Sequence, residues 1–418
     1  MTDLLTPHGA HREAWRCLQC WDAPCTAACP VHVPIPEFIA RLRGADPQGA
    51  EELVRSANPL ISTCGEICPD EQYCARACVL RGVEGPIRVR ELHRFVTETA
   101  HAPWPTWTAS RSKRVAVVGG GPAGIACARE LAALGYAVDV YERDTAAGGI
   151  VRHNLAVDRF AVDRLDRDLS ALHGAPIAWH LGQAAGSLRE ILAAHAAAFY
   201  APGTHEDILL GIPDEEGLVT SGMAFLREWR DGIGKDLTGK EVVVIGGGNV
   251  SLDVTLTAVH AGAARVVLVY RRGPREMPVW RRELEEAATR GVAIEYYARP
   301  IALLVEAGRI RGVQCRRTRL VDQGARRPVP EDMPGFDFVL PAEEVIRAVG
   351  SSPARDEDVD LRWGSKATLP VSERMETAAP SLFAGGDLVS REGTVVAAAS
   401  HGLRAARAIH HMLTEAAR

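Results

Sequence analysis

The sequence predicts an α/β fold, with a helical N-terminal domain followed by two domains built on parallel sheets, the second inserted in the first. Three observations support this prediction. Eight of the ten cysteines lie between residues 17 and 78, in a stretch whose apolar periodicity is helical. Two glycine-rich loops, at 119–124 and 246–251, each stand between a short apolar strand and a helix. The length of 418 residues suits about three domains.

The eight N-terminal cysteines form two compact quartets. The first has the spacing C-x2-C-x4-C-x3-C-P and the second C-x3-C-x5-C-x3-C. Their members are Cys17, Cys20, Cys25 and Cys29, then Cys64, Cys68, Cys74 and Cys78. Thiolates spaced this closely wrap one face of an iron–sulfur cube, and a proline after the last cysteine often directs that thiolate to a second cluster. Two [4Fe-4S] clusters are therefore the first interpretation.

Two other interpretations of the quartets are weaker. Paired disulfides belong to small secreted domains, and nothing in the sequence indicates secretion. Structural zinc sites usually show C-x-x-C pairs separated by a longer gap. The remaining cysteines, Cys127 and Cys315, are expected to pack as small hydrophobic residues.

Composition excludes several classes of protein. The net charge of −5 argues against a nucleic-acid-binding protein, which would carry a concentrated basic face. Residues 1–16 contain no apolar run of the kind found in signal peptides. No stretch approaches eighteen apolar residues without a charge, so no membrane span is expected. Together with cysteines that suit a reducing compartment, these features favour a cytoplasmic protein.

The first glycine-rich loop is the fingerprint of a dinucleotide site. Strand 114–118 precedes Gly119, Gly121 and Gly124, and an alanine-rich helix follows. The glycines permit a tight turn and let the backbone approach a pyrophosphate at the helix N-terminus. The next strand, 137–141, ends at Glu142, where a ribose hydroxyl would be held. Gly148 and Gly149 would let the chain pass close to the same ligand.

The fingerprint recurs after strand 241–245, with Gly246, Gly248 and, in place of the third glycine, Ser251. A repeat of this kind predicts a second dinucleotide. The following strand, 265–270, ends in Arg271 and Arg272, which favours the 2′-phosphate of NADPH over the 2′-hydroxyl of NADH. The alternative is that both arginines are solvated ends of a strand.

Later segments return to the first domain. Strands are expected at 197–200, at 344–349 before Gly350 and at 381–384 before Gly386 and Asp387, with a helix from Gly393 onward. The segments 166–172 and 281–290 are expected to be solvated helix faces, and 103–107 an extended linker. We expect an iron–sulfur domain at 1–110, a first nucleotide-binding domain at 111–212 and 347–418, and a second nucleotide-binding domain at 213–346.

These residues together resemble the small subunit of bacterial glutamate synthase and its relatives, above all the N-terminal module of dihydropyrimidine dehydrogenase and its separate bacterial counterpart. The resemblance rests on both cysteine quartets, on Asn58–Leu60 and Glu84–Ile87, on Gly119–Gly124 and Gly246–Asp253, and on Phe383–Asp387. It implies FAD in the first nucleotide domain and NAD(P)H in the second.

The resemblance also implies a crossed assignment of the cluster ligands. Cluster 1 would be held by Cys17, Cys20, Cys25 and Cys78, and cluster 2 by Cys29, Cys68, Cys74 and a fourth ligand. The module of dihydropyrimidine dehydrogenase has glutamine as this fourth ligand, at the position of His93 here. Imidazole is a competent ligand that raises the potential of a cluster. Cys64 or solvent is the alternative.

Further contacts follow from the fingerprints and the resemblance together. The residues assigned to FAD are Gly119, Gly121, Pro122, Ala123, Gly124, Glu142, Arg143, Gly149, Arg159, Gly386, Asp387, Thr394 and Val395. Those assigned to NAD(P)H are Gly246, Gly248, Asn249, Val250, Ser251, Arg271, Arg272 and Gly350. The loop 154–159 departs from the family, which often has proline there before the arginine.

The predicted function is electron input. NAD(P)H would reduce FAD, and the two clusters would pass single electrons to a partner oxidoreductase subunit or a ferredoxin. Alignment of the cofactors suffices for hydride transfer, so no catalytic residue is predicted. The alternatives are an enzyme like thioredoxin reductase, which needs a C-x-x-C pair beside the flavin, a zinc-containing nucleotide-binding scaffold, and a self-sufficient enzyme with its own substrate domain.

Overall fold

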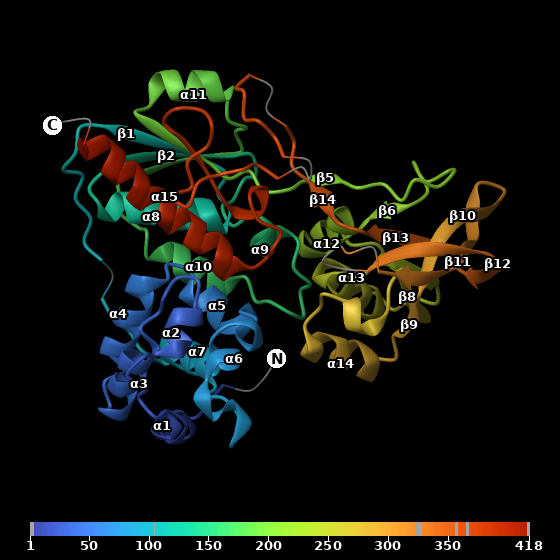
Figure 1. Ribbon diagram of the computed structural model, residues 1–418, viewed down its shortest axis with the longest axis horizontal. Coiled ribbons are helices and arrows are strands. Elements are labelled where there is room, and N and C mark those ends of the chain that lie inside the picture. The colour runs from blue at the N-terminus through green and yellow to red at the C-terminus, as the bar shows by residue number, and fades with distance from the viewer. Residues whose placement is uncertain are drawn as a thin grey trace. The chain divides into compact units, whose positions relative to one another are not determined.

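The structure is a computed structural model that describes residues 4–103, 105–322, 324, 328–355, 358–364 and 368–415, without the side chain of Arg282 (Figure 1). Residue 104 of the predicted linker 103–107 lies outside this set. The chain forms two compact units. Unit 1 comprises Met1–Arg152, Ala161–Thr204 and Pro353–Arg418, and unit 2 comprises His153–Phe160 and His205–Ser352. Unit 2 thus interrupts unit 1, as predicted, and its main segment runs from 205 to 352.

The N-terminal part of unit 1 is helical. Its helices are α1 (Pro7–Arg16), α2 (Pro24–Ala28), α3 (Ile35–Arg43), α4 (Pro47–Ala57), α5 (Ile61–Ile67), α6 (Cys74–Ala77) and α7 (Val89–Thr99). Helices α1 and α4 begin with proline, and Thr6 and Asp46 cap them by accepting hydrogen bonds from backbone N–H groups. Phe38, Val54 and Leu92 are fully buried between the helices. This small core holds the short cysteine-bearing segments in place.

The rest of unit 1 is a parallel sheet with the strand order β15-β4-β1-β2-β3. Its strands are β1 (Arg114–Val118), β2 (Ala137–Glu142), β3 (Ile177–Leu181), β4 (Ala197–Tyr200) and β15 (Leu382–Ala384). Its helices are α8 (Pro122–Ala133), α9 (Ile150–His153, which ends in unit 2), α10 (Asp163–Ser170), α11 (Leu188–Ala194) and α15 (Val395–Glu415). Helices α8 and α15 pack against each other on one face of the sheet (Figure 1). The apolar runs read from the sequence are therefore the central strands of this sheet.

Unit 2 contains a second parallel sheet, with the order β6-β13-β7-β8-β9, and an antiparallel sheet β10-β11-β12. The strands are β5 (Glu206–Asp207), β6 (Thr220–Ser221), β7 (Glu241–Gly246), β8 (Arg265–Tyr270), β9 (Ala293–Tyr296), β10 (Ala298–Glu306), β11 (Arg309–Val321), β12 (Val329–Pro341), β13 (Glu344–Ala348) and β14 (Ser351–Ser352). The helices are α12 (Gly222–Arg230), α13 (Asn249–His260) and α14 (Arg281–Thr289). Cys127 lies in the core of unit 1 and Cys315 in that of unit 2, so both pack as predicted.

The expectation of a solvated face at 166–172 is wrong. Asp168 of α10 is buried, and its two carboxylate oxygens accept hydrogen bonds from the backbone N–H groups of Ser62 (2.9 Å) and Thr63 (2.8 Å). Helix α5 has no side-chain cap of its own, so its first N–H groups need an acceptor from elsewhere in the chain. Asp168 therefore fastens the helical domain to the sheet domain within unit 1.

The expectation for 281–290 is only partly correct. Helix α14 exposes Arg281, but Glu283 is largely buried in an ion pair described below. None of the helices in the described ranges combines the length and the apolar character needed to cross a bilayer.

Candidate functional site

The cysteines of the helical domain line two cavities. The first cysteine cavity comprises about 420 Å³ of space, part of it open to solvent, between α1, α2, α3 and the segment that follows α6. Its cysteines are Cys17, Cys20, Cys25, Cys74 and Cys78. Hydrophobic side chains such as Ile39 and Leu80 form the rest of the wall. The structure thus brings the end of the second quartet to the first three cysteines of the first quartet.

The second cysteine cavity encloses about 400 Å³ and lies next to the first, since Ile35, Cys74 and Val89 line both. Its possible ligands are Cys29, Cys64, Cys68, Cys74 and His93. The cysteines surround a cavity in each case, and no three His, Cys, Asp or Glu side chains of the described chain converge on a single ion. Ligands held apart around a cavity fit a cluster of several atoms.

Burial makes these thiols poor acids in the absence of a metal. It raises the pKa of Cys25 to about 11 and that of Cys64 to about 12. It also raises the pKa of Cys29 and of Cys68. A buried thiolate is costly unless a cation replaces its proton, so metal binding here is coupled to release of protons. The buried thiols are therefore suited to metal binding and unsuited to act as free reactive thiols.

His93 of α7 lines the second cysteine cavity and carries an unsatisfied nitrogen. Its side chain is buried, and its Nε2 atom has no hydrogen-bond partner among the described residues. Burial lowers the pKa of His93 to about 3, so the imidazole is neutral. A neutral imidazole with one open nitrogen is the form that binds a metal. Cys64 lines the same cavity and stays the alternative ligand.

Substitution separates these two ligands. We expect His93→Cys to keep cluster 2 with a lower reduction potential, because thiolate donates more charge to iron than imidazole does. Cys64→Ser should leave the cluster in place. Redox titration followed by electron paramagnetic resonance measures both properties. Loss of a cluster in Cys64→Ser, with His93→Ala retaining both clusters, would instead give the ligand role to Cys64.

The residues assigned to FAD gather in unit 1, Arg159 excepted. Gly119, Gly121, Pro122, Ala123 and Gly124 form the turn from β1 into α8. A Cβ atom on Gly124 would lie 1.8 Å from the carbonyl oxygen of Gly119, so no side chain fits there. The turn leaves the N-terminus of a twelve-residue helix open toward a pyrophosphate.

Glu142 ends β2 beside this turn. Its Oε2 atom accepts a hydrogen bond from Gly120 N (2.7 Å), and its Oε1 atom accepts one from Asp144 N (2.9 Å). The carboxylate is thereby oriented and keeps further lone pairs for a ribose hydroxyl. Gly149 passes within close contact of Gly121, whereas Arg143 is exposed.

The segment between β15 and α15 completes this group. Gly386 packs against Ala123, and Asp387 follows it. Burial raises the pKa of Asp387 to about 6, and its carboxyl group has no hydrogen bond or ion pair among the described residues. A half-buried carboxyl group without a partner suits a hydroxyl donor from a ligand. Thr394 and Val395 stand at the N-terminus of the 21-residue helix α15.

Tyr73 is a residue that the sequence analysis missed. Its hydroxyl donates a hydrogen bond to Glu392 Oε1 (2.8 Å) and lies 3.0 Å from Thr394 Oγ1. Tyr73 and Val396 also line the second cysteine cavity. This cavity therefore adjoins the start of α15. No signal in the sequence marks Tyr73, because its partners lie more than 300 residues away.

The residues assigned to NAD(P)H gather in unit 2. Gly246, Gly248, Asn249, Val250 and Ser251 form the turn from β7 into α13. A Cβ atom on Gly246 would lie 2.3 Å from the carbonyl oxygen of Ala348. Ser251 occupies the position of the third glycine, and its hydroxyl donates a hydrogen bond to Gly248 O (2.6 Å). The Oδ1 atom of Asn249, a residue assigned to NAD(P)H, is buried and has no hydrogen-bond partner in the described chain.

Arg271 and Arg272 directly follow β8, and Gly350 follows β13 of the same sheet. Arg272 donates to the carbonyl of Pro328 (3.3 Å). Arg271 is exposed, and its guanidinium has no hydrogen bond or ion pair within the described ranges. No carboxylate neutralises this arginine, so an anionic group of a ligand can do so.

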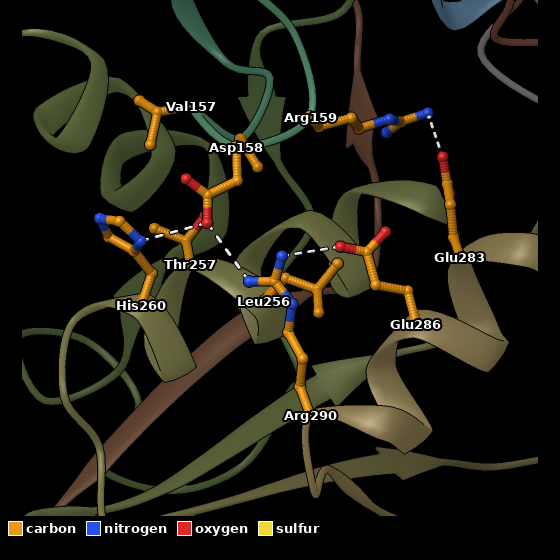
Figure 2. A pocket seen from close by; sticks show the side chains of 10 residues that line it. Val157, Asp158, Arg159, Leu256, Thr257, His260, Glu283, Glu286 and Arg290 are labelled. Carbon is orange, nitrogen blue, oxygen red and sulfur yellow. Dashed lines mark hydrogen bonds and ion pairs between the residues drawn. The ribbon is translucent and has the colours of Figure 1, made fainter. Parts of the chain in front are cut away.

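Arg159 belongs to unit 2, whereas the other residues assigned to FAD belong to unit 1. It pairs with Asp253 (2.6 Å) and Glu283 (2.8 Å), and its guanidinium stacks 4.5 Å from the ring centre of Trp280. Figure 2 shows Arg159 and Glu283 beside a pocket in which Asp158 bridges His260 and Arg290. The Nε atom of Arg159 is buried without a partner in the described chain, so one donor is left for a ligand.

Known proteins share this organisation. Residues 1–103 match a family described as dihydropyrimidine dehydrogenase domain II, 4Fe-4S cluster, and residues 113–402 match the family of pyridine nucleotide-disulphide oxidoreductases. Together these matches give an iron–sulfur domain followed by flavin- and pyridine-nucleotide-binding domains. The resemblance noted in the sequence is thereby confirmed.

Similar proteins include an NADPH enzyme and an NAD enzyme. The glutamate synthase [NADPH] small chain of Escherichia coli is 30% identical, over 97% of this chain and 91% of the relative. The NAD-dependent dihydropyrimidine dehydrogenase subunit PreT of Salmonella typhimurium is also 30% identical, over 100% and 97%. The putative oxidoreductase AegA of Escherichia coli is 33% identical over 96% of this chain, which spans only 65% of that relative.

Among solved structures, FprA of Mycobacterium tuberculosis in complex with NADPH matches with a TM-score of 0.64. The match covers 73% of this chain and 86% of FprA at 20% identity, which establishes a shared fold. Residues 1–103 of the chain thus correspond to the 4Fe-4S domain of dihydropyrimidine dehydrogenase. The chain is an oxidoreductase that belongs to the pyridine nucleotide-disulphide oxidoreductase family, in the group formed by the glutamate synthase small chains and PreT.

Proposed function

We propose that this protein is an electron-input subunit. It oxidises NAD(P)H at the turn before α13, holds FAD at the turn before α8 and at the start of α15, and passes single electrons through two [4Fe-4S] clusters to a partner protein. FAD and NAD(P)H supply the hydride chemistry, and the clusters supply transfer of single electrons. A reducing compartment such as the cytoplasm suits the cluster thiolates.

One observation carries this proposal: the proposed flavin site, the second cysteine cavity and the first cysteine cavity follow one another within unit 1. The start of α15 adjoins the second cysteine cavity through Tyr73 and Val396. The second cavity shares Ile35, Cys74 and Val89 with the first. The first cavity is bordered by Leu18 and Val79, both more than half exposed. This order supports a path from the flavin to the protein surface.

The residues of the chain position the cofactors and take no covalent part. Glu142 and Asp387 offer carboxylate acceptors to hydroxyl groups of FAD, and α8 directs its N-terminal N–H groups at the pyrophosphate. Helix α15 brings its positive end to the same site, which stabilises negative charge on a reduced flavin. Asp168 and Tyr73 hold the cysteine cavities against this domain.

Anaerobic reduction tests the function. The purified protein should contain about eight iron and about eight sulfide per chain, as two [4Fe-4S] clusters require. Excess NADPH should bleach the flavin and also produce the paramagnetic signals of reduced clusters. Reduction of the flavin with fully loaded clusters that stay oxidised would exclude electron transfer through them. A colourless zinc protein would exclude the proposal as a whole.

The nucleotide preference is argued from Arg271. A 2′-phosphate is a dianion or close to one, and a guanidinium contact with it is among the stronger charge-assisted pairs. Arg271 has no other partner in the described chain and stands where NADP-specific proteins place such an arginine. We therefore propose NADPH as the physiological donor, although the relatives use both nucleotides.

Arg271→Ala should lower the ratio of the second-order rate constants for flavin reduction by NADPH and by NADH. We expect a drop of about ten-fold, because one charge-assisted contact is lost and NADH never makes it. Stopped-flow absorbance gives both constants. Arg275→Ala, which changes another arginine of the same loop, serves as the matched control. An unchanged ratio in Arg271→Ala and in Arg272→Ala would show that neither arginine recognises the phosphate.

A further inference from the structure

Large hydrophobic side chains lie exposed around the first cysteine cavity. We name as the tryptophan patch the residues Trp15, Leu18, Trp21, Val79 and Val83. Their exposed fractions run from 52% for Val79 to 101% for Trp21. Several large exposed apolar side chains in one region often mark an interaction site, and tryptophan is among the side chains most enriched at the centres of interfaces.

The members of the patch belong to one surface. Leu18 and Val79 line the first cysteine cavity together with Cys17, Cys20 and Cys78. Arg16 donates hydrogen bonds to the carbonyls of Glu84 (3.0 Å) and Gly85 (2.8 Å), which brings the end of α1 to the turn that contains Val83. The two tryptophans flank the first two cysteines in sequence.

Trp15 is held in its exposed position. Its Nε1 atom donates to His11 Nε2 (3.0 Å), and the Arg43 guanidinium stacks 5.0 Å from the centre of its ring. Arg43 in turn donates to the carbonyls of Ala14 (3.0 Å) and Trp15 (3.4 Å). An aromatic side chain that is already ordered loses little conformational entropy when a partner covers it.

Basic residues border the patch. Arg12, Arg76 and Arg81 are exposed, and none of them has an ion pair within the described ranges. Arg12 and Trp15 are three residues apart on α1, so their side chains are neighbours. The carboxylates in the same segments are Glu13, Asp22 and Glu84. Glu13 is buried in an ion pair with Arg16 (2.7 Å), and Glu84 lies 3.9 Å from Arg16. The border therefore favours a partner with acidic residues around an apolar contact.

Resting on the proposed function, we infer that the tryptophan patch is the docking surface for the electron acceptor, a protein that carries its redox centre beneath an apolar surface bordered by carboxylates. Electron tunnelling weakens steeply with distance, so the acceptor must approach the ligands of cluster 1. The patch covers this approach. The acceptor gains one electron in each encounter, and two encounters consume the pair of electrons released by one NADPH.

A small acidic ferredoxin is the probe for this surface. We expect the double variant Trp21→Ser with Val83→Ser to reduce the ferredoxin with a kcat/KM at least about ten-fold lower, which corresponds to about 1.4 kcal/mol. Neither residue lines a cysteine cavity. Iron content and the rate of ferricyanide reduction should therefore stay at wild-type values. Phe336→Ser, which removes a hydrophobic side chain 60% exposed on β12, is the matched control and should change nothing.

The arginine border has its own signature. Arg76→Glu with Arg81→Glu should slow reduction of the acidic ferredoxin at low salt, and the difference from wild type should shrink as salt screens the charges. If the patch variant reduces ferredoxin as fast as wild type does, or if wild type reduces ferricyanide but no ferredoxin, the docking surface is overturned. Sedimentation that shows a dimer in wild type and a monomer in the patch variant would assign the patch to a second copy. Failure of wild type to reduce ferricyanide would instead overturn the proposed function.

Discussion

Cys17→Ser and Cys78→Ser should each remove one and the same cluster, although the two cysteines are far apart in sequence and belong to different quartets. Both line the first cysteine cavity, whereas Cys29 and Cys68 line the second. Loss of one thiolate leaves three ligands and an open iron corner, so we expect that cluster to be lost or degraded. Electron paramagnetic resonance of the reduced protein, with iron and sulfide analysis, should show loss of about half of the clusters.

The companion variants define the second cluster. Cys29→Ser and Cys68→Ser should remove the signal that the first pair retains. Cys315→Ser, which changes a buried cysteine in the core of unit 2, controls for effects of thiol removal and should keep both clusters. If Cys17→Ser and Cys78→Ser abolish different signals, the crossed arrangement of the ligands is wrong. Transfer of electrons to a protein acceptor should cease in every variant that loses cluster 1.

Arg159→Ala should destabilise unit 2 by about 3–5 kcal/mol, the typical cost of removing one partner from a buried ion pair. The guanidinium lies between Asp253 and Glu283, whose side chains are 3% and 13% exposed. Its removal leaves the buried carboxylate of Asp253 without this cation. Burial already raises the pKa of Asp253 in the presence of Arg159, although the arginine opposes this shift. Urea denaturation of unit 2, followed by the fluorescence of Trp229 and Trp280, measures the loss.

Arg290→Ala is the matched control, since Arg290 pairs with Asp158 and Glu286 at about one third exposure in the same pocket (Figure 2). Ion pairs this accessible to solvent contribute about 0–1 kcal/mol, so the control should change little. Arg159→Ala also separates the two roles proposed for Arg159, which are stabilisation of unit 2 and contact with FAD. A loss of stability without loss of flavin assigns it to the structure of unit 2, whereas weaker flavin binding at unchanged stability would assign it to the cofactor.

The sequence by itself determined the local elements and the chemistry they hold. Strands β1, β4 and β8 begin and end where the apolar patterns predicted. The glycines of both turns were identified because a missing side chain is a local requirement, visible in spacing alone. The cysteine quartets indicated clusters because their spacing is also a local feature: most ligands of one cluster come from residues that are close in sequence.

Only the tertiary structure decided which distant residues meet. Asp168 was expected in solvent and instead accepts hydrogen bonds from N–H groups of α5. Helix α5 has no side-chain cap of its own, so its first N–H groups can donate to a carboxylate that the fold brings near. Tyr73 reaches the start of α15, and Arg159 lies with Asp253 in unit 2. Such contacts depend on how helices and sheets pack. Packing depends on side chains hundreds of residues apart, so neither periodicity nor spacing along the chain records it.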